Sequence, residues 1–138
     1  MSLPRGIRNH NPLNIRRSEN QWKGLAEVQT DSEFCQFIAP EWGWRAAFRL
    51  LTRTYYLKYH LDTIRQIVSR WAPSSENDTR AYIENVSRLT GIAPDQSLGN
   101  PKQQPASWLL VGAAMAIQEN GSTSINWLAM LKGWEMCK

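Results

Sequence analysis

The sequence predicts a mainly α-helical domain of the α+β class, with about five helices and one small β-hairpin around a single core. Apolar residues recur at helical spacing through most of the chain after Pro40. Before Pro40, one short segment alternates apolar and polar side chains, which is typical of strands. The 138 residues are 42% hydrophobic and 20% charged, which suits one globular domain spanning residues 1–138.

The first forty residues predict a loop followed by the hairpin. Residues 5–21 include NHNPLN, in which asparagine and proline both favour turns. The segment WKGLAEVQTDSEFCQFI then predicts two strands, at about 22–29 and 33–38, joined by a turn near Asp31. This hairpin is the one sheet that the sequence predicts.

The first helical pattern after Pro40 covers about residues 41–60. Its apolar positions form one stripe: Trp44, Ala47, Phe48, Leu51, Tyr55 and either Leu57 or Tyr59. A second helix is expected to begin with Asp62 as its N-cap. Its inward-facing residues are Ile64, Ile67, Val68 and Trp71.

Three further helices complete the prediction. The third, in NDTRAYIENVSRLTG, ends at Gly91, because glycine accepts the left-handed conformation that closes a helix. Its apolar face comprises Ile83, Val86 and Leu89. Pro105 suits the first turn of a fourth helix, which runs to Glu119. A short fifth helix is expected from Ser124 to Trp134.

Composition and charge exclude several classes of protein. The net charge of +4 and the pI of about 9.3 suit a polyanionic partner, such as nucleic acid, a membrane surface or cell-wall polymer. No apolar run approaches the roughly 20 residues that cross a membrane, and the start MSLPRG has no apolar signal region. Two cysteines and two histidines lack metal-site spacing, and the glycines form no phosphate-binding loop. We therefore expect no metal, no cofactor, and synthesis in the cytoplasm without a signal peptide.

Glu119 is the acidic residue that local structure explains least. Glu76, Asp78 and Glu41 lie at helix starts, where negative charge is favourable, and Glu84 lies on a solvated helix face. Glu119 instead ends an apolar helix, where the helix dipole repels an anion. The dipole and desolvation would both raise its pKa, as a general acid requires. The alternative is an exposed glutamate on a fraying last turn.

Several segments resemble a family of small proteins encoded by bacteriophages and bacterial genomes, which are variously labelled virion structural or lysozyme-like proteins. The matching segments are RGIRNHNPLNIRR, QWKG, DSEFCQF, GWRAAFRLL, TIRQIVSRWAP and ENDTRAYIENV. They cover nearly the whole chain in order, and RWAPSSEN is the most specific. The resemblance implies a lysozyme-like domain.

A weaker resemblance is to lysozyme-superfamily glycan hydrolases, including lytic transglycosylases and autolysin-type glucosaminidases. Those enzymes carry a catalytic glutamate at a helix end in a Glu-x-Gly context, which QENG matches. NHNPLNI and TDSEFCQF are similar to their two other elements. Here the glutamate helix comes last instead of first, so the resemblance implies a circular permutation with neighbouring chain termini.

This resemblance implies cleavage of peptidoglycan glycan strands, in which Glu119 protonates the glycosidic oxygen. Asp31 and Glu33 are the candidates for a second catalytic carboxylate. Simple turn chemistry is the alternative for both residues and the favoured interpretation of Asp31. The candidates for sugar binding are Asn9, Asn11, Asn14, Trp22 and Tyr82. The alternatives are that these asparagines shape loops and that these aromatic residues belong to the core.

We therefore expect a monomeric enzyme of the lysozyme or lytic transglycosylase type, which acts at the cell wall or periplasm or in a phage particle. The alternative is a non-catalytic phage structural or cell-wall-binding module with the same fold. Nucleic-acid binding is not expected, because the chain has no DNA-reading motif and a charge of only +4.

Overall fold

The computed structural model describes residues 3–75 and 78–138, which form one mainly helical domain. Its helical elements are α1 (Arg5–Arg8), α2 (Pro40–Arg49), the π-helix η1 (Leu50–Lys58), α3 (Ile64–Trp71), α4 (Thr79–Thr90), α5 (Pro105–Asn120) and α6 (Trp127–Glu135). The five predicted helices correspond to α2 with η1, α3, α4, α5 and α6. The sequence analysis missed α1, a single turn inside the expected loop.

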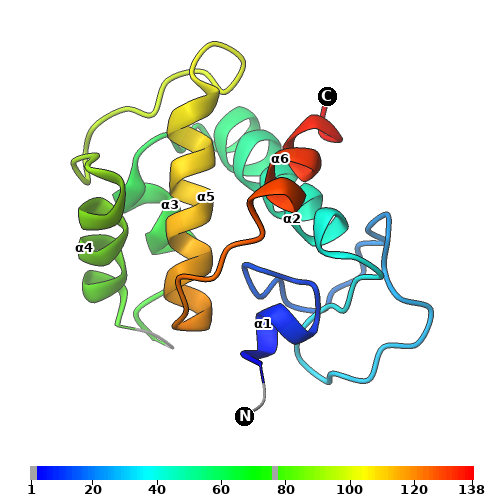
Figure 1. Cartoon of the computed structure of the whole chain (residues 1–138). Coiled ribbons are helices and arrows are strands. Elements are labelled where there is room, and N and C mark those ends of the chain that lie inside the picture. The colour runs from blue at the N-terminus through cyan, green and yellow to red at the C-terminus, as the bar shows by residue number, and fades with distance from the viewer. Residues whose placement is uncertain (1–2, 76–77) are drawn as a thin grey trace.

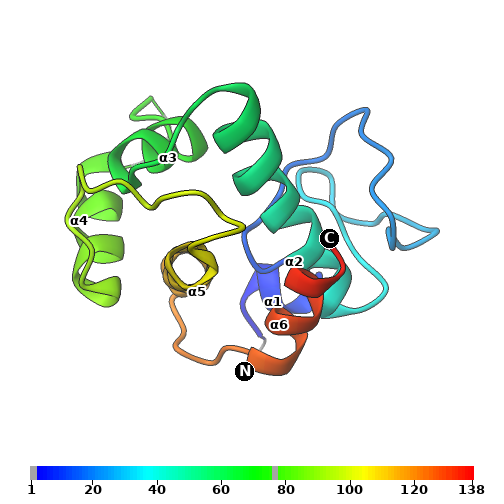
Figure 2. The ribbon, with the colours of Figure 1, turned by 90° about the horizontal axis from the view of Figure 1, so that it is seen from above.

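Helix α5 runs through the middle of the molecule (Figure 1). Seen from above, α3 and α4 lie on one side of it and α2 and α6 on the other (Figure 2). α4 packs on α3 and α5, α2 packs on α6, and α1 contacts α5. α5 is buried continuously from Val111 to Ala116, which accounts for a sequence that is apolar on nearly every face.

Local sequence signals set the helix ends. Asp78 caps α4 by accepting a hydrogen bond from the backbone N–H of Ala81, as its position predicts; Glu76 lies outside the described residues. Gly91 ends α4 with φ of 75°, so the predicted stop is confirmed, and Gly121 ends α5 in the same left-handed conformation with φ of 60°.

One predicted cap is wrong by one residue. Thr63, not Asp62, caps α3, and its hydroxyl accepts from the N–H of Gln66 at 3.2 Å. The Asp62 carboxylate instead accepts a 2.6 Å hydrogen bond from the Ser97 hydroxyl. Asp62 therefore ties the start of α3 to the loop before α5.

The core contains most of the predicted apolar stripe, including Trp44, Phe48 and Leu51. Leu57 and Tyr59 are instead 62% and 37% exposed. The helix changes to π geometry after Arg49, and the N–H of Tyr59 bonds to the carbonyl of Thr54, five residues back. This wider turn breaks the 3.6-residue period on which the prediction rested.

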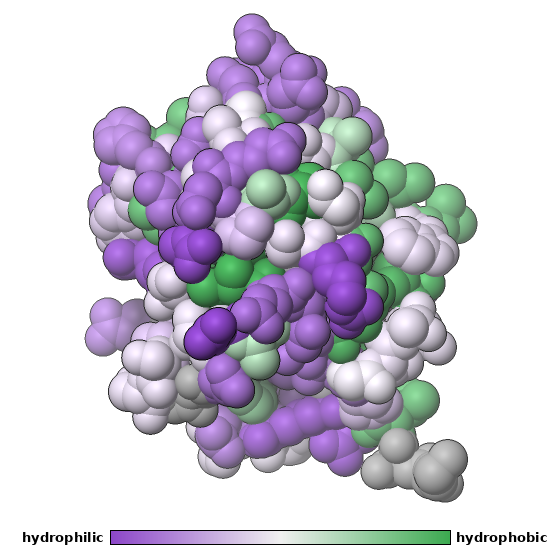
Figure 3. All heavy atoms as spheres, turned by 90° about the vertical axis from the view of Figure 1, so that its left-hand side faces the viewer, coloured by the Kyte–Doolittle hydropathy of each residue, from purple (hydrophilic) through white to green (hydrophobic). Residues whose placement is uncertain are grey.

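The outer face of α4 is solvated. Leu89 is 41% exposed rather than buried, and the Glu84 side chain is 65% exposed beside Arg80. Figure 3 shows the side of the molecule that carries α4, where hydrophilic side chains dominate and hydrophobic ones appear between them. Glu84 is therefore the surface residue that its position predicts.

The predicted hairpin is wrong: the described residues have two isolated antiparallel bridges, Arg16 with Phe34 and Leu25 with Phe37. Residues 33–38 lie between 15–17 and 24–26 and bond to both. Regular strand pairing stops at Gln36, because the Gln29 side chain bonds to the Gln36 backbone where a partner strand would otherwise bond. Its amide accepts from the N–H of Gln36 and donates to the Gln36 carbonyl, both at 2.8 Å.

The C-terminal end of the chain lies apart from α1, the first described helix. In Figure 1 the C-terminal end is at the top beside α6, whereas α1 lies at the bottom. This arrangement does not favour the circular permutation that the weaker resemblance implies, because a permutation joins the termini. None of the helices in the described ranges is long and apolar enough to cross a membrane.

Candidate functional site

The Glu119 carboxylate lies in the last turn of α5 and faces the beginning of the chain. The side-chain N–H of Asn14 donates to Oε1 and the Tyr82 hydroxyl donates to Oε2, both at 3.0 Å. The Trp71 side chain, at the end of α3, is a further donor. Glu119 is half-buried, so it is not the exposed residue of a fraying turn. One carboxylate thus joins α3, α4, α5 and the N-terminal segment.

The surroundings of Glu119 keep its proton more tightly bound than in water. Burial raises the pKa of Glu119, and the hydrogen bonds of Asn14 and Tyr82, the positive charge of Arg16 and the Trp71 contact offset part of that rise. Burial, and then the nearby Glu119 charge, raises the pKa of the Tyr82 hydroxyl well above its ordinary value. Tyr82 therefore remains a donor, and Glu119 has the property that a general acid needs.

Asn14 reaches Glu119 because its backbone takes an unusual conformation, with φ of 52°. Asparagine tolerates this left-handed region better than most residues. The Asn14 side-chain oxygen is buried without a hydrogen-bond partner. It would lie 2.8 Å from a Cβ atom on Gly6, and the Asn120 side-chain oxygen would be closer still. α1 therefore approaches the end of α5 only because residue 6 is glycine.

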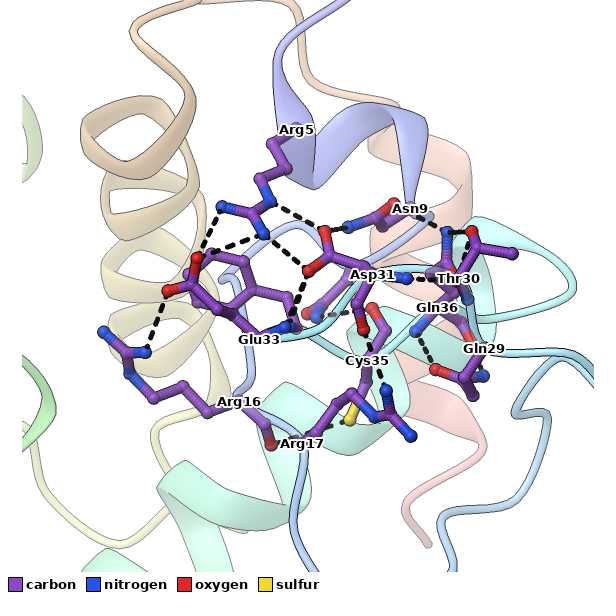
Figure 4. Close-up of polar contacts among 12 residues, drawn as sticks. Arg5, Asn9, Arg16, Arg17, Gln29, Thr30, Asp31, Glu33, Cys35 and Gln36 are labelled. Carbon is purple, nitrogen blue, oxygen red and sulfur yellow. Dashed lines mark hydrogen bonds and ion pairs between the residues drawn. The ribbon is translucent and has the colours of Figure 1, made fainter.

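Asp31 belongs to a separate network (Figure 4). Arg5 in α1 donates to both of its oxygens, at 2.7 and 2.6 Å, and Asn9 donates to Oδ2 at 3.0 Å. The backbone N–H groups of Glu33 and Phe34 also donate to Oδ1. The bond from Arg5, more than the other contacts, holds the pKa of Asp31 far below its usual range. These contacts support the turn interpretation of Asp31.

Glu33 lies nearer to solvent, and its side chain is 52% exposed. It pairs with Arg5 at 3.4 Å and with Arg16 at 3.5 Å (Figure 4). The charge of Arg16 also acts on Glu119. Arg16 therefore links the Glu33 and Glu119 carboxylates electrostatically.

Two predicted sugar-binding asparagines are used inside the protein. The Asn11 side chain is fully buried and bonds to backbone atoms of Ile15 and Cys35. Asn9 is 6% exposed, and its side chain contacts Asp31 and Gln36. Both asparagines act here as loop-shaping residues.

The two predicted aromatic residues are also separated. Tyr82 is 4% exposed, so its ring belongs to the core and only its hydroxyl reaches Glu119. Trp22 lines a cavity of about 320 Å³ with Arg49 and Leu50, residues at the junction of α2 and η1. Asn14 and Tyr82 thus both contact Glu119, whereas Trp22 lies in a different part of the structure.

Comparison with known proteins identifies a phage relative. No protein-family model matches the chain. The chain is 44% identical over 134 residues to Protein P5 of Pseudoalteromonas phage PM2, covering 95% of this chain and 80% of the phage protein. The chain belongs to the Protein P5 family. The name of that relative states no activity and no structural role.

In this member of the Protein P5 family, the sequence analysis missed two residues that act on Glu119, namely Trp71 and Arg16. Trp71 carries no local signal for this role, because its periodicity places it on the apolar face of α3. Arg16 was visible only as one of several basic residues near the start of the chain. Within the described ranges, no group of three His, Cys, Asp or Glu side chains is arranged to hold a metal ion.

Proposed function

We propose that this protein cleaves the glycan strands of peptidoglycan, as lysozymes and lytic transglycosylases do, with Glu119 as the general acid. The observation that carries the proposal is a half-buried carboxyl group with a raised pKa, which is held by Asn14, Tyr82 and Trp71. A carboxyl group in such surroundings keeps its proton closer to neutral pH and delivers it to a leaving oxygen.

The chemistry follows from the donors around Glu119. Its proton goes to the glycosidic oxygen as the bond to the anomeric carbon breaks, and an oxocarbenium-like transition state develops. Asn14 and Tyr82 then stabilise the carboxylate that remains. That carboxylate next removes a proton from the attacking water, or from a sugar hydroxyl in a transglycosylase, which restores the acid.

The positive charge on the sugar needs a stabilising group. Glu33 suits this role better than Asp31, because Glu33 is half-exposed and Arg5 holds both oxygens of Asp31. The substrate's own acetamido group is the other source of stabilisation. The excess of basic residues near the start of the chain would strengthen binding to an anionic cell wall, and high salt would weaken that contribution.

The test is lysis of permeabilised Gram-negative cells, with mass spectrometry of the muropeptides released from purified peptidoglycan. Wild-type protein should produce new reducing or anhydro ends, and Glu119→Gln should abolish them while remaining folded by circular dichroism. Glu84→Gln removes an exposed carboxylate from α4 and should leave the rate unchanged. Equal product release by wild type and Glu119→Gln would remove Glu119 from the mechanism.

The second candidate is a non-catalytic module that binds the cell wall or forms part of a phage particle. It is favoured by the internal use of Asp31, Asn9 and Asn11, which leaves few of the predicted catalytic and sugar-binding groups available. The phage origin of the Protein P5 relative fits it too. This candidate predicts saturable binding to purified peptidoglycan with no new chain ends.

A further inference from the structure

The larger of the two described cavities, about 550 Å³, lies far from Glu119. Pro105, which begins α5, is in its wall, whereas Glu119 is in the last turn of the same helix. The two residues are 14 positions apart, which corresponds to about 21 Å at about 1.5 Å per residue. Its volume falls within the range of small-molecule sites.

The wall of this cavity is mainly apolar and well supported. The Trp134 ring packs edge-on against Phe48 with centroids 5.0 Å apart, and Tyr56 packs likewise against Trp108 at 5.5 Å. Leu57, which the sequence predicted for the core, is 62% exposed and lies in this wall. The change to π geometry in η1 therefore directs an apolar side chain to a cavity instead of the core.

The charged lining residues are all basic. Arg53, Lys102 and Lys138 line the cavity, and no Asp or Glu side chain is among its described lining residues. Lys138 Nζ lies 3.1 Å from Glu135, and Arg53 donates to the Cys137 carbonyl at 2.8 Å. Even with these contacts, an apolar wall with a basic rim favours an anion that carries an apolar body.

We propose that this cavity binds an amphipathic anion of small-molecule size. An alkyl or aromatic body would lie against Tyr56, Leu57 and Trp134, and its carboxylate or phosphate would lie beside Arg53 and Lys102. The site is separate from Glu119 and does not depend on the proposed glycan cleavage. Such a ligand can be a free carboxylate or a lipid within a membrane, and both present the same chemistry.

The test uses the full-length protein with decanoate below its micelle concentration, and with decanol as an uncharged alkyl control. Isothermal titration should give saturable one-site binding of decanoate and binding of decanol that is weaker by about tenfold or more. Arg53→Gln with Lys102→Gln should weaken decanoate binding by about tenfold and leave decanol unchanged. Lys102→Gln alone should show part of the loss, which guards against an effect of Arg53 on the C-terminal end. Arg88→Gln, on the exposed side of α4, is the matched control.

Decanoate binding should persist in Glu119→Gln, so the result of the binding test does not depend on the result of the glycan-cleavage test. Vesicles with anionic phospholipid provide the second arm. Vesicle binding that decanoate displaces would support a membrane lipid as the source, and decanoate binding without vesicle binding would support a free anion. Absence of saturable decanoate binding, equal affinity for decanol, or full affinity in the double variant would overturn the proposal.

Discussion

Removing the Tyr82 hydroxyl tests whether Glu119 is held as the structure describes. Tyr82→Phe keeps the buried ring and deletes the 3.0 Å hydrogen bond to Oε2 of Glu119. A hydrogen bond to a charged group contributes about 1.5–3 kcal/mol, and Trp71 continues to donate to Glu119. We therefore expect a loss of about 2 kcal/mol at pH 8, near the low end of that range.

The size of the thermal shift follows from the length of the chain. An unfolding entropy of about 2.1 cal/mol/K per residue gives about 0.29 kcal/mol/K for 138 residues, so Tm should fall by about 7 °C. The Tyr82 bond favours the charged carboxylate, so its loss should raise the pKa of Glu119 further. At pH 4 the carboxyl group is increasingly protonated, and the cost should fall toward the roughly 1 kcal/mol of a neutral hydrogen bond.

The assay is a double-mutant cycle by urea unfolding, with Tyr82→Phe, Glu119→Gln and the double variant. The coupling energy at pH 8 should be about 1 kcal/mol, because glutamine keeps an acceptor but carries no charge. Tyr59→Phe, which alters an exposed tyrosine, should change stability by less than about 0.5 kcal/mol. A coupling below about 0.5 kcal/mol, or a cost of Tyr82→Phe that does not depend on pH, would refute the described contact.

Three further predictions test the surrounding structure. Gly6→Ala should lower the urea midpoint by an amount equivalent to about 1–3 kcal/mol, because its Cβ would overlap the Asn120 side chain. Arg5→Gln should lower Tm at pH 7. The difference should begin to shrink as the pH falls below about 4, where the unfolded Asp31 carboxyl takes up a proton, and it should disappear only in much stronger acid, because the lowered pKa keeps Asp31 charged in the folded protein. The raised pKa of Glu119 means that unfolding free energy falls as pH rises above 4.5, and Glu119→Gln should remove that part of the pH dependence.

The helices could be predicted because their signals are local. Asp78 caps α4, and Gly91 and Gly121 close α4 and α5, through contacts within one turn. The hairpin prediction was wrong because the Gln29 side chain bonds to the Gln36 backbone in place of a neighbouring strand. An alternation of apolar and polar residues gives no sign of such a side-chain contact. Leu57 was misplaced because the prediction assumed a constant helical period, which η1 does not keep.

The candidate site could be predicted in part, because Glu119 lies where a negative charge is unfavourable. Glu119 stood out because its position opposes the helix dipole, and Asn14 because it lies in a turn-rich segment that the resemblance singled out. The Arg5 contact with Asp31 joins residues 26 positions apart, and no periodic pattern links them. Trp71 reaches Glu119 for a similar reason, since only tertiary packing brings the end of α3 to the end of α5.

Asp31 and Glu119 show two ways in which this protein surrounds a carboxylate. Asp31 has a bidentate arginine and backbone donors, which fix the charged form and suit a structural anchor. The direct hydrogen-bond donors to Glu119 are the neutral side chains of Asn14, Tyr82 and Trp71, and burial outweighs them and the more remote charge of Arg16. A carboxylate that serves only to anchor the chain stabilises the folded protein when it stays in its charged form, as Asp31 does. Glu119 instead carries a charge that costs stability near neutral pH, which is the property that the proposed role as a general acid requires.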